Sequence, residues 1–221
     1  MIPRTLPAWA AFSLLELLVV MAIVTLLSLA ALPAFHAIAS AHGVTKGAYD
    51  LEELVELARS EAVAKQTYVW VGVATNNSSG NAEVIAASVY SRDGSGTNTN
   101  AVNLAALSKV IHLRNAALAS WSDLKAGTKA QFTNQVPASI ATNTGGISFN
   151  VGGAVFQSRT ITFTPRGEAT LSGSVGPDDG FDPGIDIGFR QARGATVLPG
   201  ADDAAVVIDG ATGMARIIRL P

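Results

Sequence analysis

An uninterrupted apolar run near the N-terminus, residues 12–35, constrains this chain more than any other feature of its sequence. It reads FSLLELLVVMAIVTLLSLAALPAF, and about 20 such residues in a helix can cross the hydrocarbon core of a bilayer. Only Glu16 interrupts the run with a charge. An ionised carboxylate at mid-membrane costs about 2.5–3.5 kcal/mol on insertion scales, so a charge in this position indicates a specific role.

A partner for Glu16 would arise if the chain were cut between Ala11 and Phe12. The cut would create an α-amino group four residues before the carboxylate. One helix cannot easily bring these two groups together, but a neighbouring subunit shifted along the helix axis could. Glu16 would then be neutralised on assembly, and the pairing would set the register between subunits.

The block AFSLLELLVV, residues 11–20, resembles the processing motif of type IV pilins and type II secretion pseudopilins. In that family a small residue precedes the cut, the Phe after it becomes N-methylated, and a Glu follows four residues later. The resemblance therefore assigns cleavage to Ala11 and Phe12, subunit register to Glu16 and a helix kink to Pro33. The family prefers Gly before the cut, so Ala11 puts the efficiency of cleavage in question.

Two other interpretations of the run remain. An ordinary signal peptide would end at a small-residue site such as residues 39–41, Ala-Ser-Ala. A plain single-pass anchor is also physically sound. Neither gives Glu16 a role.

The sequence after the run keeps a helical period. Leu51, Leu54, Val55, Ala58 and Ala62 form one apolar stripe. Gly43 and Gly47 lie before the stripe, and each weakens a helix by about 1 kcal/mol relative to Ala, which indicates a flexible joint.

Beyond residue 67 the pattern changes to short strands and turns. We expect strands at residues 68–74, 83–90, 109–114, 147–151, 155–157, 160–164, 169–171, 185–189, 206–208 and 215–220. Residues 93–100 are too polar to pack and are expected to form a surface loop or flexible tip, and residues 116–135 give no clear pattern. The resulting expectation is an α+β, pilin-like fold. A long N-terminal helix, transmembrane in its first half and amphipathic in its second, packs on a mostly antiparallel β-sheet domain. The expected divisions are a leader (1–11), a transmembrane and assembly helix (12–35), its amphipathic continuation (36–66) and a β-rich globular domain in the periplasm (67–221).

The segment after the stripe resembles a narrower group, the GspH/FimT-type minor pseudopilins. The helical part carries the residues Ala58, Arg59 and Ser60 of their pattern, and residues 163–167 match the F-x-P-x-G turn between two strands. The first block also resembles pilin-like members of the Verru_Chthon cassette proteins. Arg59 is either a solvated residue of the helix surface or, as the resemblance suggests, a tie between helix and sheet.

Composition excludes several kinds of chemistry. The chain has no cysteine, so it has no disulfides, thiolate metal sites or cysteine nucleophiles. Its net charge of −2 gives no indication of a nucleic-acid partner. No catalytic motif is recognisable, and we expect neither enzymatic activity nor a cofactor.

Two charged clusters are candidate binding sites. Asp178, Asp179, Asp182 and Asp186 could supply oxygens to Ca²⁺, but their spacing does not match an EF-hand loop, and we favour a solvated turn. Arg216 and Arg219 could contact nucleic acid, as some FimT-type minor pilins do, but Asp202, Asp203 and Asp209 lie nearby in the sequence and offset their charge.

The expected function is that of a structural subunit, cut by prepilin peptidase and assembled into a type II secretion pseudopilus or type IV pilus. Within it, the chain would be a minor component serving protein secretion. The expected partners are prepilin peptidase, other pilins or pseudopilins, and the inner membrane. The chain would cross that membrane once, with its N-terminus cytoplasmic and its globular domain periplasmic, because Arg4 in the leader follows the positive-inside tendency. The alternative is a binding module at a filament tip, for DNA uptake or for recognition of a secreted substrate.

Overall fold

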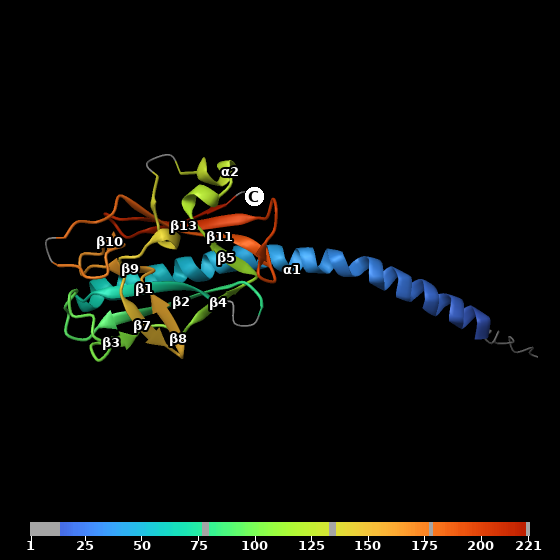
Figure 1. Cartoon of the computed structure of the whole chain (residues 1–221), viewed down its shortest axis with the longest axis horizontal. Helices are drawn as coiled ribbons and strands as arrows, with labels where there is room; N and C mark the ends of the chain where they lie inside the picture. The colour runs from blue at the N-terminus through green and yellow to red at the C-terminus, as the bar shows by residue number, and fades with distance from the viewer. Residues whose placement is uncertain (1–13, 77–79, 133–135, 177–178, 220–221) are drawn as a thin grey trace, which may run out of the picture. The chain divides into compact units, whose positions relative to one another are not determined.

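The computed structural model describes residues 14–76, 80–132, 136–176 and 179–219, with the side chains of residues 29–42 excepted. The chain separates into two compact units, residues 1–39 and residues 40–221. The longest element, helix α1 (Leu14–Lys65), begins in the first unit and ends in the second. Figure 1 labels most of the helices and strands used below. The division into four segments expected from the sequence stays a prediction.

The described part of the first unit is a helix that exposes all its side chains. Every residue from 14 to 28 is exposed, and Leu14 (82%) and Leu15 (73%) are the most exposed leucines among them. The hydroxyls of Thr25 and Ser28 donate to the helix's own carbonyls, those of Ala22 (2.9 Å) and Val24 (2.8 Å). The first unit therefore presents a long, almost wholly apolar surface.

The prediction that the first half of the N-terminal helix spans a membrane is wrong for the residues that the structure describes. Within them, no helix combines the length and the apolar character needed to cross a membrane. This finding corrects the fold class and also the expected location, a single-pass anchor in the inner membrane with a periplasmic domain.

The second unit is built mostly from antiparallel β-sheet around the C-terminal half of α1. Residues of α1 that recur with the helical period, Val44, Ala48, Leu51, Val55 and Ala58, are almost completely buried. They share one core cluster with inward-facing residues of two sheets. Figure 1 shows β1 and β2 on one side of this part of α1 and β11 and β13 on the other.

The first sheet has the strand order β10-β9-β1-β2-β3, with β4 also pairing with β2. The two longest strands, β1 and β2, pair antiparallel over eight residues, from Val69 opposite Tyr90 to Asn76 opposite Glu83. The bounds are β1 Val69–Asn76, β2 Glu83–Ser91, β3 Leu104–Ala106, β4 Ile111–Arg114, β9 Thr160–Phe163 and β10 Ala169–Thr170.

The second sheet has the order β12-β11-β13-β14, and β5 and β6 also pair with β11. All its pairs are antiparallel except that between β11 and β6, which is parallel and two residues long. The bounds are β5 Ala116–Ala119, β6 Ala138–Ser139, β11 Gly184–Arg193, β12 Thr196–Val197, β13 Asp203–Asp209 and β14 Ala215–Arg219.

Each sheet has a cover on the face away from α1. The first is covered by a hairpin, β7 (Ser148–Val151) and β8 (Ala154–Gln157), whose Phe149 and Phe156 stack 5.0 Å apart next to Trp70. The second is covered by the segment that gave no clear sequence pattern. That segment holds two short helices, η1 (Trp121–Asp123) and α2 (Ala126–Lys129), and a further turn, η2 (Ile140–Thr142), follows β6.

The joint expected at Gly43 and Gly47 is not a break in the helix, since α1 continues through both positions. At Gly47 an added Cβ would lie 2.8 Å from the Leu113 side chain, and at Gly43 it would lie 3.2 Å from the Arg114 carbonyl oxygen. The two glycines therefore allow β4 to approach the helix closely.

Candidate functional site

The N-terminal part of α1 carries the residues to which the sequence assigned assembly. Ala11 and Phe12 lie outside the described residues. Glu16 lies in the first turn of the described part of α1. Pro33 lies within α1, and the kink expected there stays a prediction. The described site is thus an exposed apolar helix surface with one acidic residue at its start.

Arg59 joins α1 to the last hairpin of the second sheet. Its Nε donates a 2.7 Å hydrogen bond to the carbonyl of Thr212, in the turn between β13 and β14. One helical turn earlier, the Glu56 carboxylate accepts a 2.8 Å bond from the backbone N–H of Ala215. Arg59 therefore forms the tie between helix and sheet that the family resemblance suggested.

The four aspartates considered for calcium do not converge in the described structure. Asp178 lies outside the described residues. Asp179 accepts a 2.6 Å bond from the N–H of Gly176, Asp182 accepts a 2.7 Å bond from the N–H of Leu171, and Asp186 is completely buried in β11. Across the described parts of the chain, no group of three or more histidine or acidic side chains is placed to hold a metal ion. The carboxylates at 179 and 182 instead fix the backbone of their own loop.

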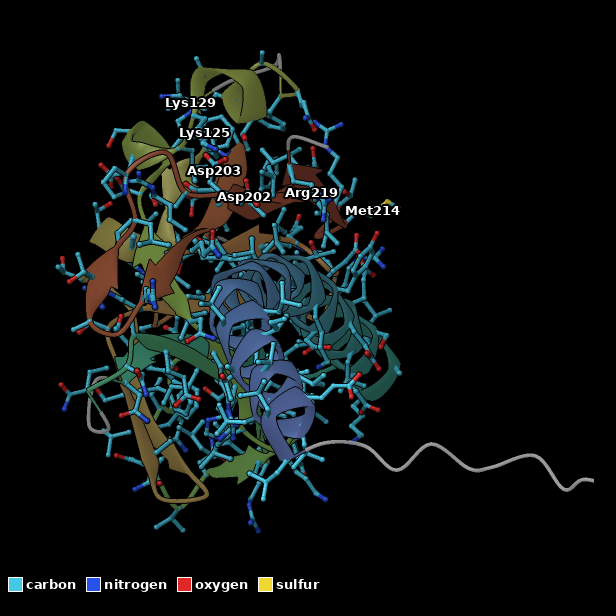
Figure 2. The ribbon with its side chains drawn as sticks, turned by 90° about the vertical axis from the view of Figure 1, so that its right-hand side faces the viewer. Lys125, Lys129, Asp202, Asp203, Met214 and Arg219 are labelled. Carbon is cyan, nitrogen blue, oxygen red and sulfur yellow. The ribbon has the colours of Figure 1, made fainter. Side chains whose placement is uncertain are left out.

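The two arginines considered for nucleic acid lie on opposite faces of β14. Side chains alternate along a strand, so residues 216 and 219 point to opposite sides. The Arg216 guanidinium lies 5.0 Å from the centre of the Phe132 ring on the outer face. Arg219, which is labelled in Figure 2, donates to the hydroxyl of Thr45 on α1. Because phosphate binding needs cations that converge on one surface, this pair does not form such a surface.

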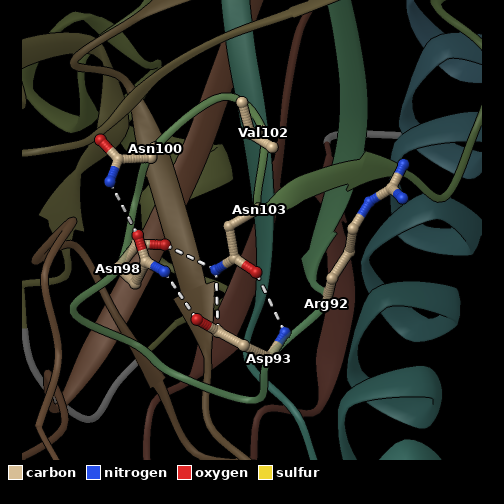
Figure 3. Close-up of a pocket in the computed structure, with 6 residues that line it drawn as sticks. All are labelled: Arg92, Asp93, Asn98, Asn100, Val102 and Asn103. Atoms are coloured by element: carbon tan, nitrogen blue, oxygen red, sulfur yellow. Dashed lines mark hydrogen bonds between the residues drawn. The ribbon is translucent and has the colours of Figure 1, made fainter.

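The structure also shows a polar pocket that sequence reasoning missed. It has a volume of about 350 Å³ and is lined by residues of the 92–103 loop (Figure 3). Asp93 organises this loop: its carboxylate accepts bonds from the N–H of Ser95 (2.9 Å), the Asn98 amide (2.6 Å) and the Asn103 amide (2.8 Å). These hydrogen bonds hold the pKa of Asp93 well below its usual range, and the bond from the Ser95 N–H has the largest influence. The segment expected to be a loop or flexible tip is thus a loop held by one carboxylate.

A second missed feature is a pair of buried carboxylates beneath the cover of the second sheet. Asp203 accepts bonds from the N–H of Lys125 (2.5 Å) and the hydroxyl of Thr128 (2.9 Å), which fixes the start of α2 to the sheet (Figure 2). Asp186 accepts a 3.2 Å bond from the Ser139 hydroxyl on β6. The sequence signal for Asp186 was an aspartate inside an apolar strand pattern, whereas Asp203 stands at the start of its strand and gave no such signal.

Comparison of the chain with protein-family models, with curated proteins and with solved structures found no significant match.

Proposed function

We propose that this chain is a structural subunit of a pilin-like filament, cut between Ala11 and Phe12, N-methylated at Phe12 and assembled through α1. The observation that carries the proposal is the exposure of every described side chain from residue 14 to residue 28. Contiguous exposed apolar surface of this size marks an interaction site. The side chains concerned include Leu14, Leu15, Leu18, Met21, Val24, Leu26 and Leu27.

The position of Glu16 fits subunit register in such a filament. It is the only acidic residue in the apolar run and lies in the first turn of α1. In the assembled state its carboxylate pairs with the methylated amino group of Phe12 on a neighbouring subunit. The energy of a charge pair in apolar surroundings depends strongly on the register between the two subunits, because a shift that separates the charges leaves each of them buried without a partner.

Within this class, a minor pseudopilin of a protein secretion system is the proposed role. The support is the GspH/FimT-like segment around Arg59, where the arginine contacts the terminal hairpin. The alternative, a tip module that binds DNA, has less support because Arg216 and Arg219 point to opposite faces of β14.

Processing is tested by the intact mass and N-terminal sequence of the full chain expressed with and without prepilin peptidase. We expect a chain that starts at methylated Phe12 only when the peptidase is present. A chain that starts at Met1 under both conditions, or near residue 42 under both, contradicts the proposal.

Assembly is tested with Glu16→Ala against Glu53→Ala, which removes the same charge from an exposed position on the second-unit part of α1. Filament incorporation is measured by shearing and immunoblotting. We expect Glu16→Ala to lose incorporation and Glu53→Ala to retain it; equal incorporation of the two variants contradicts the register role.

A further inference from the structure

Asp186 occupies an unusual position for a carboxyl group. It lies in the middle of β11 and has no exposed surface. Its Oδ2 accepts the 3.2 Å hydrogen bond from Ser139, while its Oδ1 is buried without a hydrogen-bond partner. Buried carboxylates normally accept several hydrogen bonds or pair with a cation, so an ionised Asp186 is poorly accommodated here.

The strand that pairs with β11 at Asp186 is short. Strand β6 pairs with β11 through only two residue pairs, Ala138 with Ile185 and Ser139 with Asp186. The chain then enters η2, where Ile140 inserts completely into the main core. The Ser139–Asp186 contact thus lies at the start of a segment that contributes a core residue. We call residues 138–142 the β6–η2 segment.

No cation compensates the Asp186 carboxylate in the described structure. Burial is the dominant influence and raises the pKa of Asp186 to about 7, while the hydrogen bonds from Ser139 and the Gly188 N–H act in the opposite direction. No charged side chain contributes to this shift. β6 contributes no charged residue, and the charged residues on this face of β11, β13 and β14 and on the preceding cover are Arg190, Asp203, Asp209, Arg216, Asp123, Lys125 and Lys129.

Three of these charged groups are held by contacts with other residues. Asp203 accepts from the backbone of Lys125 and from Thr128, and Asp209 accepts from the N–H and the hydroxyl of Thr212. Arg216 lies over the Phe132 ring. The protonation of Asp186 is therefore governed by its burial and by its two hydrogen bonds.

We propose that the protonation state of Asp186 controls how firmly the β6–η2 segment is attached to β11. The segment is held while the Asp186 carboxyl group is protonated, and it loosens when that group loses its proton. The neutral carboxyl group is tolerated in the closed, dry interface. The carboxylate is solvated better when the segment opens and water reaches both oxygens. The segment is consequently tightest in acid and loosest above neutral pH.

The pH range follows from the two states of the carboxyl group. In the open state its pKa returns toward the ordinary value of 3.8, whereas in the closed state it is about 7. The closed state therefore binds more protons between these values, and its advantage is complete below pH 3.8 and lost as the pH rises through about 7. Within this window the opening constant rises by up to about tenfold per pH unit, and it is constant above the window.

The test is hydrogen–deuterium exchange of the full chain from pH 5 to pH 8.5, corrected for the intrinsic exchange rates. We expect protection of the amides of residues 138–142 to fall by about tenfold per pH unit between pH 5 and 7 and then to level off. Asp186→Asn replaces the carboxyl group by a neutral amide of similar shape and should make this protection independent of pH. Asp202→Asn removes the same charge from an exposed position and should keep the wild-type profile.

Two further measurements keep the proposal falsifiable if Asp186→Asn does not fold. The first is an NMR titration of the Asp186 side-chain carboxyl carbon in the wild-type protein. The second is Ser139→Ala, which removes a hydrogen bond that lowers the pKa of Asp186, so the levelling-off point should move to higher pH. Protection that is flat from pH 5 to 7 in the wild type, a pH-dependent profile retained in Asp186→Asn, or titration of Asp186 near its ordinary pKa would each overturn the proposal.

Discussion

The two sheets of the second unit differ in what covers the face that points away from α1. Both bury one face against α1 and need a cover on the other face. The first sheet is covered by an aromatic hairpin, in which Phe149 and Phe156 stack over the Trp70 region. The second is covered by a segment with two short helices, which the buried Asp203 holds through Lys125 and Thr128, while the buried Asp186 binds Ser139 on the neighbouring strand β6. An apolar cover depends little on pH, whereas we expect the contact between Asp186 and Ser139 on β6 to respond to it.

The largest expected effect is on the aromatic cover. Phe156 has no exposed surface, and Phe156→Ala should lower the free energy of unfolding by about 3–5 kcal/mol, because it removes apolar contacts and leaves a cavity. The loss is measured by urea denaturation at pH 5.5 and pH 8. It should be the same at both values, and a strongly pH-dependent loss would contradict the contrast between the covers.

A smaller loss of stability is expected from adding a side-chain carbon at Gly188, where the backbone of β11 lies close to the backbone of β5 beneath the second cover. A Cβ at Gly188 would lie 2.6 Å from the carbonyl oxygen of Ala119 and 3.2 Å from Oδ2 of Asp186. Since a backbone carbonyl in a paired strand cannot easily move, Gly188→Ala should destabilise the protein by about 2–3 kcal/mol, the upper part of the range for overpacking. Thermal unfolding monitored by circular dichroism measures the loss.

The matched position beneath the first cover should be more tolerant. A Cβ at Gly72 would lie 2.6 Å from Cζ of Phe149 and 2.9 Å from Cβ of Phe156. The nearest atom is the end of a side chain, which can shift with its hairpin, so Gly72→Ala should cost about 1–2 kcal/mol. The same thermal unfolding experiment ranks the two glycines, and a larger loss at Gly72 than at Gly188 would show that the aromatic cover is the more rigid one.

The smallest effect concerns the ion pair at the edge of the second cover. The Lys125 ammonium lies 3.9 Å from the Asp202 carboxylate, and the Asp202 side chain is 65% exposed. Solvent screens such a pair, so Lys125→Ala should change the free energy of unfolding by no more than about 0.5 kcal/mol. A loss comparable to that of Gly188→Ala would mean that surface charge, rather than the buried carboxylates, fastens this cover.

Local sequence patterns predicted many of the strands. The alternating or apolar runs at residues 68–74, 83–90, 160–164 and 206–208 all fall largely within strands of the structure. Each run is apolar, β-branched and bounded by turn residues, so its signal is local. Strand β5 and the cover of the second sheet could not be predicted in this way, because β5 and the short helices η1 and α2 depend on contacts with β11, β13 and Asp203.

The candidate sites were less predictable than the strands. Proximity in sequence suggested that Arg216 and Arg219 act together, but the alternation of side chains along β14 separates them. The aspartates at 179, 182 and 186 were grouped for the same reason, yet one lies inside β11 while the others bind loop amides. Arg59 was the residue whose tie to the sheet could be anticipated, and only through the pattern around it.

The arrangement around β14 has a consequence for how copies of this protein can meet. Strand β14 ends the second sheet, and such an end normally offers unpaired backbone groups to a foreign strand. Here the Glu56 carboxylate accepts a hydrogen bond from the outward N–H of Ala215. The Gln131 side chain accepts from the N–H of Arg219 through its oxygen and donates to the carbonyl of Arg219 through its nitrogen. Every second residue of β14 directs its backbone N–H and carbonyl toward the free edge. Between Ala215 and Arg219, Ile217 is therefore the one residue of this described strand whose edge-facing backbone groups are left for another strand. Edge-to-edge pairing of two copies through β14 is therefore disfavoured, because few backbone groups on this edge can bond to another strand.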